Sequence, residues 1–131
     1  MIALLDTHVF LWWFEQPKRL SVAQRRIIRR NDERHPLGVS DASLWEIALL
    51  IEAGRVRLEL PIEDWLSRAT AAPRVVVCPV TPSIAREIIA AAMHGWDPAD
   101  RIIVGTARTL GVPLVTADER IIDSGLVRTI H

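Results

Sequence analysis

The sequence has a single cysteine, no excess of charge of either sign and no long membrane-spanning apolar run. Because Cys78 has no second cysteine to pair with, an internal disulfide and a cysteine-based zinc cluster are both excluded. Cys78 lies in the apolar run 75–80, which predicts a buried and inert thiol. Sixteen basic and sixteen acidic residues cancel, so any binding of nucleic acid must rest on a local patch of charge.

Residues 1–14 are strongly apolar, but they lack the features of a targeting segment. They have no basic leader and no small-residue cleavage pattern, and Asp6 and His8 interrupt them. No other stretch approaches the ~18 apolar residues that a membrane span requires. These features favour a cytoplasmic protein without membrane contact.

The chain has 131 residues, half of them apolar, which is enough for one domain with its own core. It contains no internal repeat, low-complexity stretch or linker, so we predict a single domain over residues 1–131.

Short apolar runs alternate with segments that carry helix-capping residues. Residues 2–5 form a continuous apolar run, which is typical of a strand buried on both faces. Further strands are predicted over 37–39, 74–79, 112–116 and 126–130, with the valine-rich 74–79 as a central strand. Helices are predicted over 8–15, 21–30, 40–54, 61–70, 81–93 and 97–111. This alternation predicts an α/β fold with a parallel sheet covered on both faces.

Two acidic residues stand where such a fold collects its functional groups. Polar groups gather at the carboxyl ends of parallel strands. Asp6 directly follows the first strand, and Asp118 follows the strand that includes residues 114–116. Each residue also fits the N-cap of the helix that comes next, so a purely structural role is equally compatible with its position.

Glu46 and Asp100 add two more candidates. Glu46 lies in a helix that is apolar on nearly every side, where a buried carboxylate needs a cation or hydrogen-bond donors. Its alternative place is an exposed stripe of that helix. Asp97, just before Pro98, fits an N-cap, which leaves Asp100 for a favourable interaction with the helix dipole or for another role.

Carboxylates that meet in one place repel one another unless a cation neutralises them. Ligands that offer only oxygen suit Mg²⁺ or Mn²⁺, whose bound water can act on phosphate. The residues alone therefore predict an acidic metal site in an α/β fold, without identifying a substrate.

A basic segment precedes the second predicted strand. Its seven basic residues are Lys18, Arg19, Arg25, Arg26, Arg29, Arg30 and Arg34. Such a run is ordinarily a solvated helix face, and contact with phosphate is the alternative. Trp12 and Trp13 can likewise stack on bases, although packing between helices is the more ordinary role.

Four segments carry a resemblance to a known family. They are LLDTHVFLWW (4–13), SLWEIALLIEAGRV (43–56), HGWDPADRIIVGTA (94–107) and LVTADERI (114–121). In this order they resemble the PIN-domain ribonuclease toxins of bacterial VapBC-type toxin–antitoxin modules. The resemblance implies a PIN-like three-layer α/β/α sandwich around a central, mainly parallel five-stranded sheet. It also implies a Mg²⁺-dependent endoribonuclease, with Mn²⁺ as a substitute, an RNA substrate, a VapB-like antitoxin and a homodimer.

The resemblance also assigns roles to the candidate residues. It implies Asp6 and Asp100 as direct metal ligands, Glu46 and Asp118 as ligands directly or through water, and Thr7 and Thr116 as supporting polar groups.

Two departures from the family pattern leave alternatives open. Leu50 stands where related sequences often carry a lysine, so contact with phosphate is expected from Arg101 or from Arg25, Arg26 and Arg29. Asp97 is a second candidate ligand beside Asp100, although the motif alignment and the capping position of Asp97 favour Asp100.

Two other functions remain to be weighed. One is a catalytically silent PIN-fold module that binds RNA or a protein partner. The other is a phosphoryl-transfer enzyme with Asp6 as nucleophile, against which the absence of a glycine-rich phosphate loop counts.

Overall fold

The computed structural model describes residues 1–71 and 74–131, and within them five short strands alternate with helices. The strands are β1 (Ala3–Leu5), β2 (Leu37–Ser40), β3 (Val75–Cys78), β4 (Leu114–Val115) and β5 (Thr129–Ile130). All neighbouring strands pair in parallel, in the order β3-β2-β1-β4-β5. The strand that directly precedes Asp6 therefore lies at the centre of the sheet.

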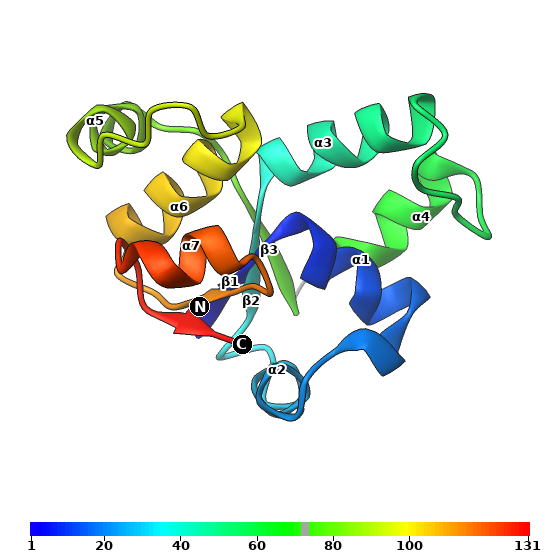
Figure 1. The fold of residues 1–131 in the computed structure, drawn as a ribbon. Coiled ribbons are helices and arrows are strands. Elements are labelled where there is room, and N and C mark those ends of the chain that lie inside the picture. Colours follow the sequence, from blue (N-terminus) through cyan, green and yellow to red (C-terminus); the bar gives the residue numbers. More distant parts are fainter. Residues whose placement is uncertain (72–73) are drawn as a thin grey trace.

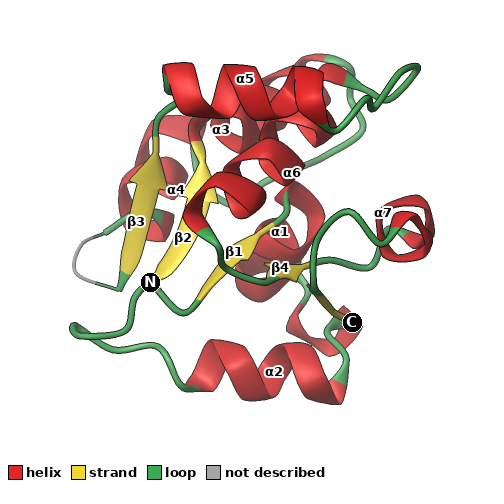
Figure 2. Cartoon of the chain, turned by 90° about the vertical axis from the view of Figure 1, so that its left-hand side faces the viewer, coloured by secondary structure: helices red, strands yellow, loops and turns green. Residues whose placement is uncertain are grey.

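Helices cover both faces of the sheet (Figures 1 and 2). They are α1 (Thr7–Glu15), the 3-10 helix η1 (Pro17–Arg19), α2 (Val22–Arg29), α3 (Asp41–Glu52), α4 (Ile62–Ala69), α5 (Pro82–Ala90), α6 (Pro98–Leu110) and α7 (Glu119–Ser124). Helices α1 to α4 pack on one face and α5 to α7 on the other. This arrangement confirms the predicted α/β/α sandwich. In the described ranges, no helix has the length and apolar character needed to span a membrane.

Side chains of β1 alternate between two apolar cores. Ala3 and Leu5 belong to the core under α1 to α4, whereas Leu4 belongs to the core under α6 and α7. All three are completely buried. Successive side chains of a strand point to opposite faces, so a strand covered by helices on both sides has to be apolar at every position. The predicted burial of this strand on both faces is confirmed.

The predicted central position of the strand over 74–79 is wrong, because β3 forms an edge of the sheet. Val76 and Val77 are 41% and 37% exposed. A run of valines reflects a preference for extended backbone, and it does not specify which neighbours the strand will have. Cys78, at the end of β3, is buried as predicted.

Local capping explains where several helices begin. The Ser21 hydroxyl accepts the Gln24 backbone N–H while the Gln24 side chain accepts the Ser21 N–H, which makes a capping box for α2. Ser40 and Thr81 cap α3 and α5 through one hydrogen bond each, in which the side-chain hydroxyl accepts a backbone N–H. These three predicted helix starts are confirmed.

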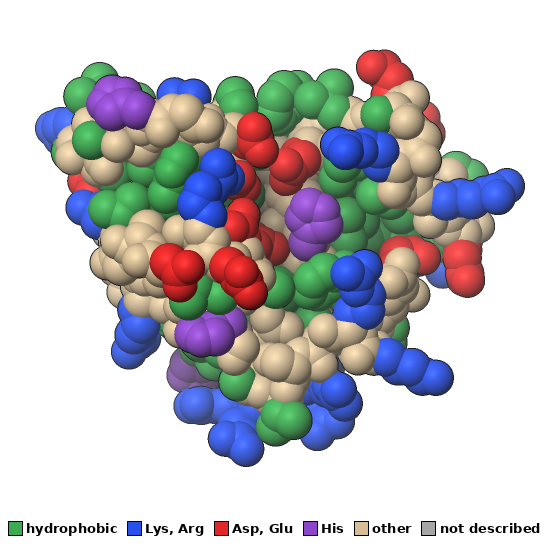
Figure 3. Space-filling model, viewed as in Figure 1, with side chains coloured by type: hydrophobic (Ala, Val, Ile, Leu, Met, Phe, Trp, Pro, Cys, Tyr) green, Lys and Arg blue, Asp and Glu red, His purple; other side chains and the backbone are tan. Residues whose placement is uncertain are grey.

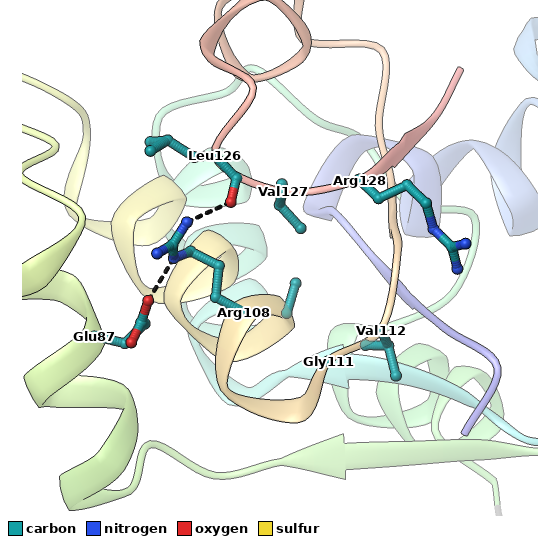
Figure 4. Close-up of a pocket in the computed structure, with 8 residues that line it drawn as sticks. Glu87, Arg108, Gly111, Val112, Leu126, Val127 and Arg128 are labelled. Carbon is teal, nitrogen blue, oxygen red and sulfur yellow. Dashed lines mark hydrogen bonds and ion pairs between the residues drawn. The ribbon is translucent and has the colours of Figure 1, made fainter.

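Helix α6 is anchored at its carboxyl-terminal half, which fixes where its first turn lies. The Arg108 guanidinium donates to Glu87 of α5 and to the Leu126 carbonyl (Figure 4). Gly105 lets α5 approach closely, since a Cβ there would lie 3.0 Å from Cγ1 of Ile88. Asp100 is therefore carried on a helix held against α5 and the segment before β5.

Candidate active site

All four predicted acidic residues line one pocket at the carboxyl ends of β1 and β4. The pocket has a volume of about 310 Å³, and its walls are Asp6, Thr7, His8, Trp12, Glu46, Asp97, Asp100, Ala117, Asp118 and Arg120. Acidic side chains gather in a hollow in the middle of this face of the molecule (Figure 3). We call this the acidic pocket. The fold thus unites carboxylates from four separate segments, and their roles as metal ligands stay predictions.

Asp6 is fixed by two hydrogen bonds, one to each carboxylate oxygen. Its Oδ1 accepts the Val9 backbone N–H at 3.0 Å, which caps α1. Its Oδ2 accepts the hydroxyl of Thr116. The side chain is only 7% exposed, so these donors provide the partners that a buried carboxylate needs. The structural role predicted for Asp6 as a helix cap is confirmed, and the same carboxylate faces the acidic pocket.

Thr116 links Asp6 to the segment that carries Asp118. Its hydroxyl donates to Asp6 and accepts the Asp118 backbone N–H at 3.0 Å. Its carbonyl accepts a hydrogen bond from the buried Gln24 side chain of α2 at 3.2 Å. Asp118 in turn caps α7 by accepting the Arg120 backbone N–H at 2.9 Å. Thr116 therefore occupies the supporting position predicted for it, next to two of the four carboxylates.

Thr7 supports the pocket from a different direction. Its hydroxyl donates to the Ser43 hydroxyl at 2.9 Å, and both side chains are buried. This bond joins the first turn of α1 to α3, the helix that carries Glu46. Thr7 thus holds the elements on two sides of the pocket together through Ser43.

Arg120 is the functional candidate that the sequence reasoning missed. Its Nη2 lies 2.7 Å from Oδ2 of Asp100 and 4.0 Å from Oδ2 of Asp118. Its guanidinium also lies over the ring of Trp96, 4.8 Å from the centroid. In the sequence, Arg120 lies two residues after Asp118 in the segment 114–121, and this position is the feature that indicates a place near the acidic residues. Its ion pair with Asp100 joins residues that are distant in sequence and depends on the fold.

The surroundings of Asp6 and Asp100 disfavour the ionised form of each carboxyl and raise its pKa. Burial raises the pKa of Asp6, although the hydrogen bonds from Thr116 and Val9 act in the opposite direction. Burial also raises the pKa of Asp100 to about 6, with further contributions from the charges of Glu46 and Asp118. The nearby Arg120 lowers the pKa of Asp100 and so offsets part of this effect. The pocket consequently has more negative charge than its own basic group neutralises.

Glu46 and Asp97 enter the pocket from α3 and from the start of α6. Glu46 is half-buried and close enough to raise the pKa of Asp100. Asp97 occupies the N-cap position of α6 but makes no capping hydrogen bond with its side chain. The N-cap position of Asp97 therefore does not favour Asp100 as the ligand, and Asp97 remains a candidate ligand alongside Asp100.

The arginines predicted to contact phosphate lie outside the acidic pocket. Arg101 donates through Nε to the Trp96 carbonyl at 2.8 Å, and Arg25 donates through Nε and Nη2 to the Leu20 carbonyl. Arg26 and Arg29 are exposed on α2. Arg120, by contrast, is part of the wall of the acidic pocket.

Comparison with known proteins identifies the family. The PIN domain family matches residues 3–125, and the chain belongs to this family. Over 119 residues it is 40% identical to Ribonuclease VapC22 from Mycobacterium tuberculosis, covering 90% of this chain and 88% of that protein. The resemblance predicted from the four sequence segments is confirmed.

Solved structures agree on the fold. A chain in the structure of VapBC2 from Rickettsia felis, bound to a DNA fragment from the promoter, superposes with a TM-score of 0.73 at 12% identity. That match covers 98% of this chain and 97% of the other. A chain of VapBC-1 from nontypeable Haemophilus influenzae gives a TM-score of 0.71 at 18% identity, covering 98% and 96% of the two chains.

Proposed function

We propose that this protein is a divalent-metal-dependent endoribonuclease and the toxin component of a type II toxin–antitoxin module. The observation that carries the proposal is the meeting of Asp6, Glu46, Asp100 and Asp118 in one pocket of a PIN fold. The 40% identity to a protein named as a VapC ribonuclease supports RNA as the substrate.

The residues of the pocket fit a hard divalent cation such as Mg²⁺ or Mn²⁺. The four candidate ligands, Asp6, Glu46, Asp100 and Asp118, offer only carboxylate oxygens, and the repulsion of their charges favours a cation among them. Within residues 1–71 and 74–131, no three His, Cys, Asp or Glu side chains stand close enough together to hold a metal ion. The proposal needs only two of the carboxylates as direct ligands, because Mg²⁺ keeps several waters and commonly binds through one or two carboxylates.

Asp6 and Asp100 are the residues proposed to hold the metal directly, with Glu46 and Asp118 acting directly or through water. A bound metal would supply an activated water and stabilise charge on the phosphate. Thr116 would keep the Asp6 carboxylate oriented, because its hydroxyl already donates to Oδ2. Arg120 would bring a positive charge to the side of the pocket where Asp100 and Asp118 lie.

The proposed partner is a VapB-like antitoxin, and the proposed assembly of the toxin itself is a homodimer. The support for the antitoxin comes from structures of VapBC complexes that share the fold, whereas the homodimer is what the family resemblance implies. Co-expression with the product of a neighbouring short reading frame should suppress the growth defect caused by the toxin and yield a complex that co-purifies. Light scattering after size-exclusion chromatography would measure the mass of the free toxin.

The experiment that tests the activity uses purified protein freed of any antitoxin and a mixed pool of cellular RNA. We expect cleavage with Mg²⁺ or Mn²⁺, none with excess EDTA, and none by the Asp6→Asn variant. The matched control is Asp123→Asn, which makes the same chemical change on the exposed surface of α7 outside the acidic pocket.

Cleavage that persists in EDTA, or equal cleavage by Asp6→Asn, would contradict the proposed chemistry. RNA binding without cleavage under every metal condition would favour the catalytically silent binding module instead. Sequencing of RNA ends after induced expression would then identify the target and the bond that is cut.

A further inference from the structure

A second pocket opens directly beside the acidic pocket. It has a volume of about 630 Å³, and its lining includes His8, Trp12, Glu46, Arg55, Arg57 and Asp97. Four of these residues, His8, Trp12, Glu46 and Asp97, also line the acidic pocket. The two cavities therefore share a wall, and a chain lying in one can continue into the other. We call the second cavity the α1–α3 groove.

Three arginines border the α1–α3 groove. Arg19 comes from η1, while Arg55 and Arg57 come from the segment between α3 and α4. All three are exposed, and none makes an ion pair or a side-chain hydrogen bond with any described residue. Figure 3 shows basic side chains on the α1 and α3 side of the acidic hollow. These guanidinium groups are available for an anionic ligand.

Trp12 adds an aromatic surface at the junction of the two cavities. The ring is half-buried, the Arg19 guanidinium lies over it at 4.4 Å from the centroid, and the His8 ring lies 6.2 Å away. One acidic member of the groove is already engaged, because the Glu15 carboxylate accepts the Trp65 indole N–H at 2.6 Å. Aromatic rings beside arginines are the combination that holds single-stranded nucleic acid.

We propose that the α1–α3 groove binds the single-stranded RNA segment that flanks the phosphate held in the acidic pocket. This inference rests on the proposed function. The acidic pocket repels phosphates in the absence of a metal, so affinity for the rest of the strand has to come from basic groups outside it. Arg55 and Arg57 contact backbone phosphates, and Trp12 stacks on a base. The exposed arginines of α2 border neither cavity and contribute little.

The test measures binding of a short, fluorescein-labelled single-stranded RNA of mixed sequence by anisotropy over a range of KCl concentrations. The protein is the full chain with Asp6→Asn, in EDTA, so that no cleavage occurs. Each phosphate contact on a single strand contributes about 0.7 to the slope of log affinity against log salt. Adding Arg55→Ala and Arg57→Ala should therefore reduce the magnitude of this negative slope by about 1.4. Adding Trp12→Leu should weaken binding roughly 5- to 150-fold, with a smaller change in slope.

The matched control adds Arg26→Ala and Arg29→Ala, which removes the same charge from the exposed face of α2. We expect its slope to stay close to that of the parent. Equal decreases in both double variants would indicate a diffuse field and overturn the assigned groove. An unchanged slope in the Arg55 and Arg57 variant would also overturn it. If that variant keeps the parental slope but no longer co-purifies with a co-expressed antitoxin, the groove is a peptide-binding site.

The cleavage assay separates this proposal from the proposed function. If wild-type protein cuts RNA with Mg²⁺ while the Arg55 and Arg57 variant keeps the parental slope, the groove assignment fails and the function stands. If wild-type protein neither cuts nor binds RNA, both fail. Thermal melting of every variant checks that a change in affinity is not caused by unfolding.

Discussion

Replacement of Asp100 by asparagine should stabilise the metal-free protein, even though it removes a proposed metal ligand. The folded protein raises the pKa of Asp100 from 3.8 to about 6, chiefly by burial and then by the charges of Glu46 and Asp118. The ionised carboxylate is therefore held in an unfavourable place. Asparagine has nearly the same shape and no charge, so Asp100→Asn removes this cost.

The magnitude follows from the difference between the two pKa values. Each unit corresponds to about 1.4 kcal/mol, so about 3 kcal/mol is the upper bound on the cost at neutral pH, and solvent screening at this partly exposed carboxyl lowers the cost below that bound. Below about pH 4 the carboxyl is protonated in both the folded and unfolded chain, and the cost vanishes. Between about pH 4 and 6 the unfolded chain releases its proton first, so the wild-type protein loses stability as pH rises. Above about pH 6 the full cost remains, and the advantage of Asp100→Asn is greatest.

Urea unfolding in EDTA, repeated from about pH 4 to 8, measures this difference. Asp123→Asn, on the exposed surface, should show little pH-dependent difference from wild type. In a parallel series with Mg²⁺ the advantage of Asp100→Asn should shrink, since the metal should raise the stability of wild type and have little effect on Asp100→Asn. A flat difference across this pH range, or a metal-free Asp100→Asn less stable than wild type at pH 8, would refute the reasoning.

Three further substitutions test contacts around the pocket. Arg120→Ala should bind Mn²⁺ more tightly in calorimetric titrations, because the pocket loses a competing cation 2.7 Å from Asp100; weaker binding would contradict this. Thr116→Val should lower the free energy of unfolding by about 1–3 kcal/mol in urea, because the buried Asp6 loses a hydrogen-bond donor. For Gly105→Ala two effects oppose each other: alanine favours the helix by about 1 kcal/mol, whereas its Cβ would lie 3.0 Å from Cγ1 of Ile88, so a lower melting temperature shows that the packing of α5 on α6 dominates and a higher one contradicts this.

The sequence was most informative where a single residue has a local structural duty. Ser21, Ser40 and Thr81 each begin a helix in the structure as predicted. The apolar run that contains β1 was also enough to predict burial on both faces. Such predictions succeed because the capping bonds and the alternation of side chains depend on neighbours within a few residues.

Features that depend on distant segments were not predictable in the same way. The edge position of β3 depends on which strands pair beside it, and its sequence, Val-Val-Val-Cys, does not specify those neighbours. The ion pair between Arg120 and Asp100 requires the first turns of α6 and α7 to meet. The gathering of the four carboxylates was inferred from the fold class and from the family resemblance, and their spacing alone would not have established it.

Asp6 has one further consequence, which concerns how such a protein can lose activity. Its carboxylate caps α1 and accepts a hydrogen bond from Thr116, so the position has a duty in folding as well as its proposed chemistry. Asparagine is also a favourable N-cap, and a single base change converts an aspartate codon into an asparagine codon. A lineage under selection against cleavage thus has a short route to a folded but inert protein, which would still present the same surfaces to a partner.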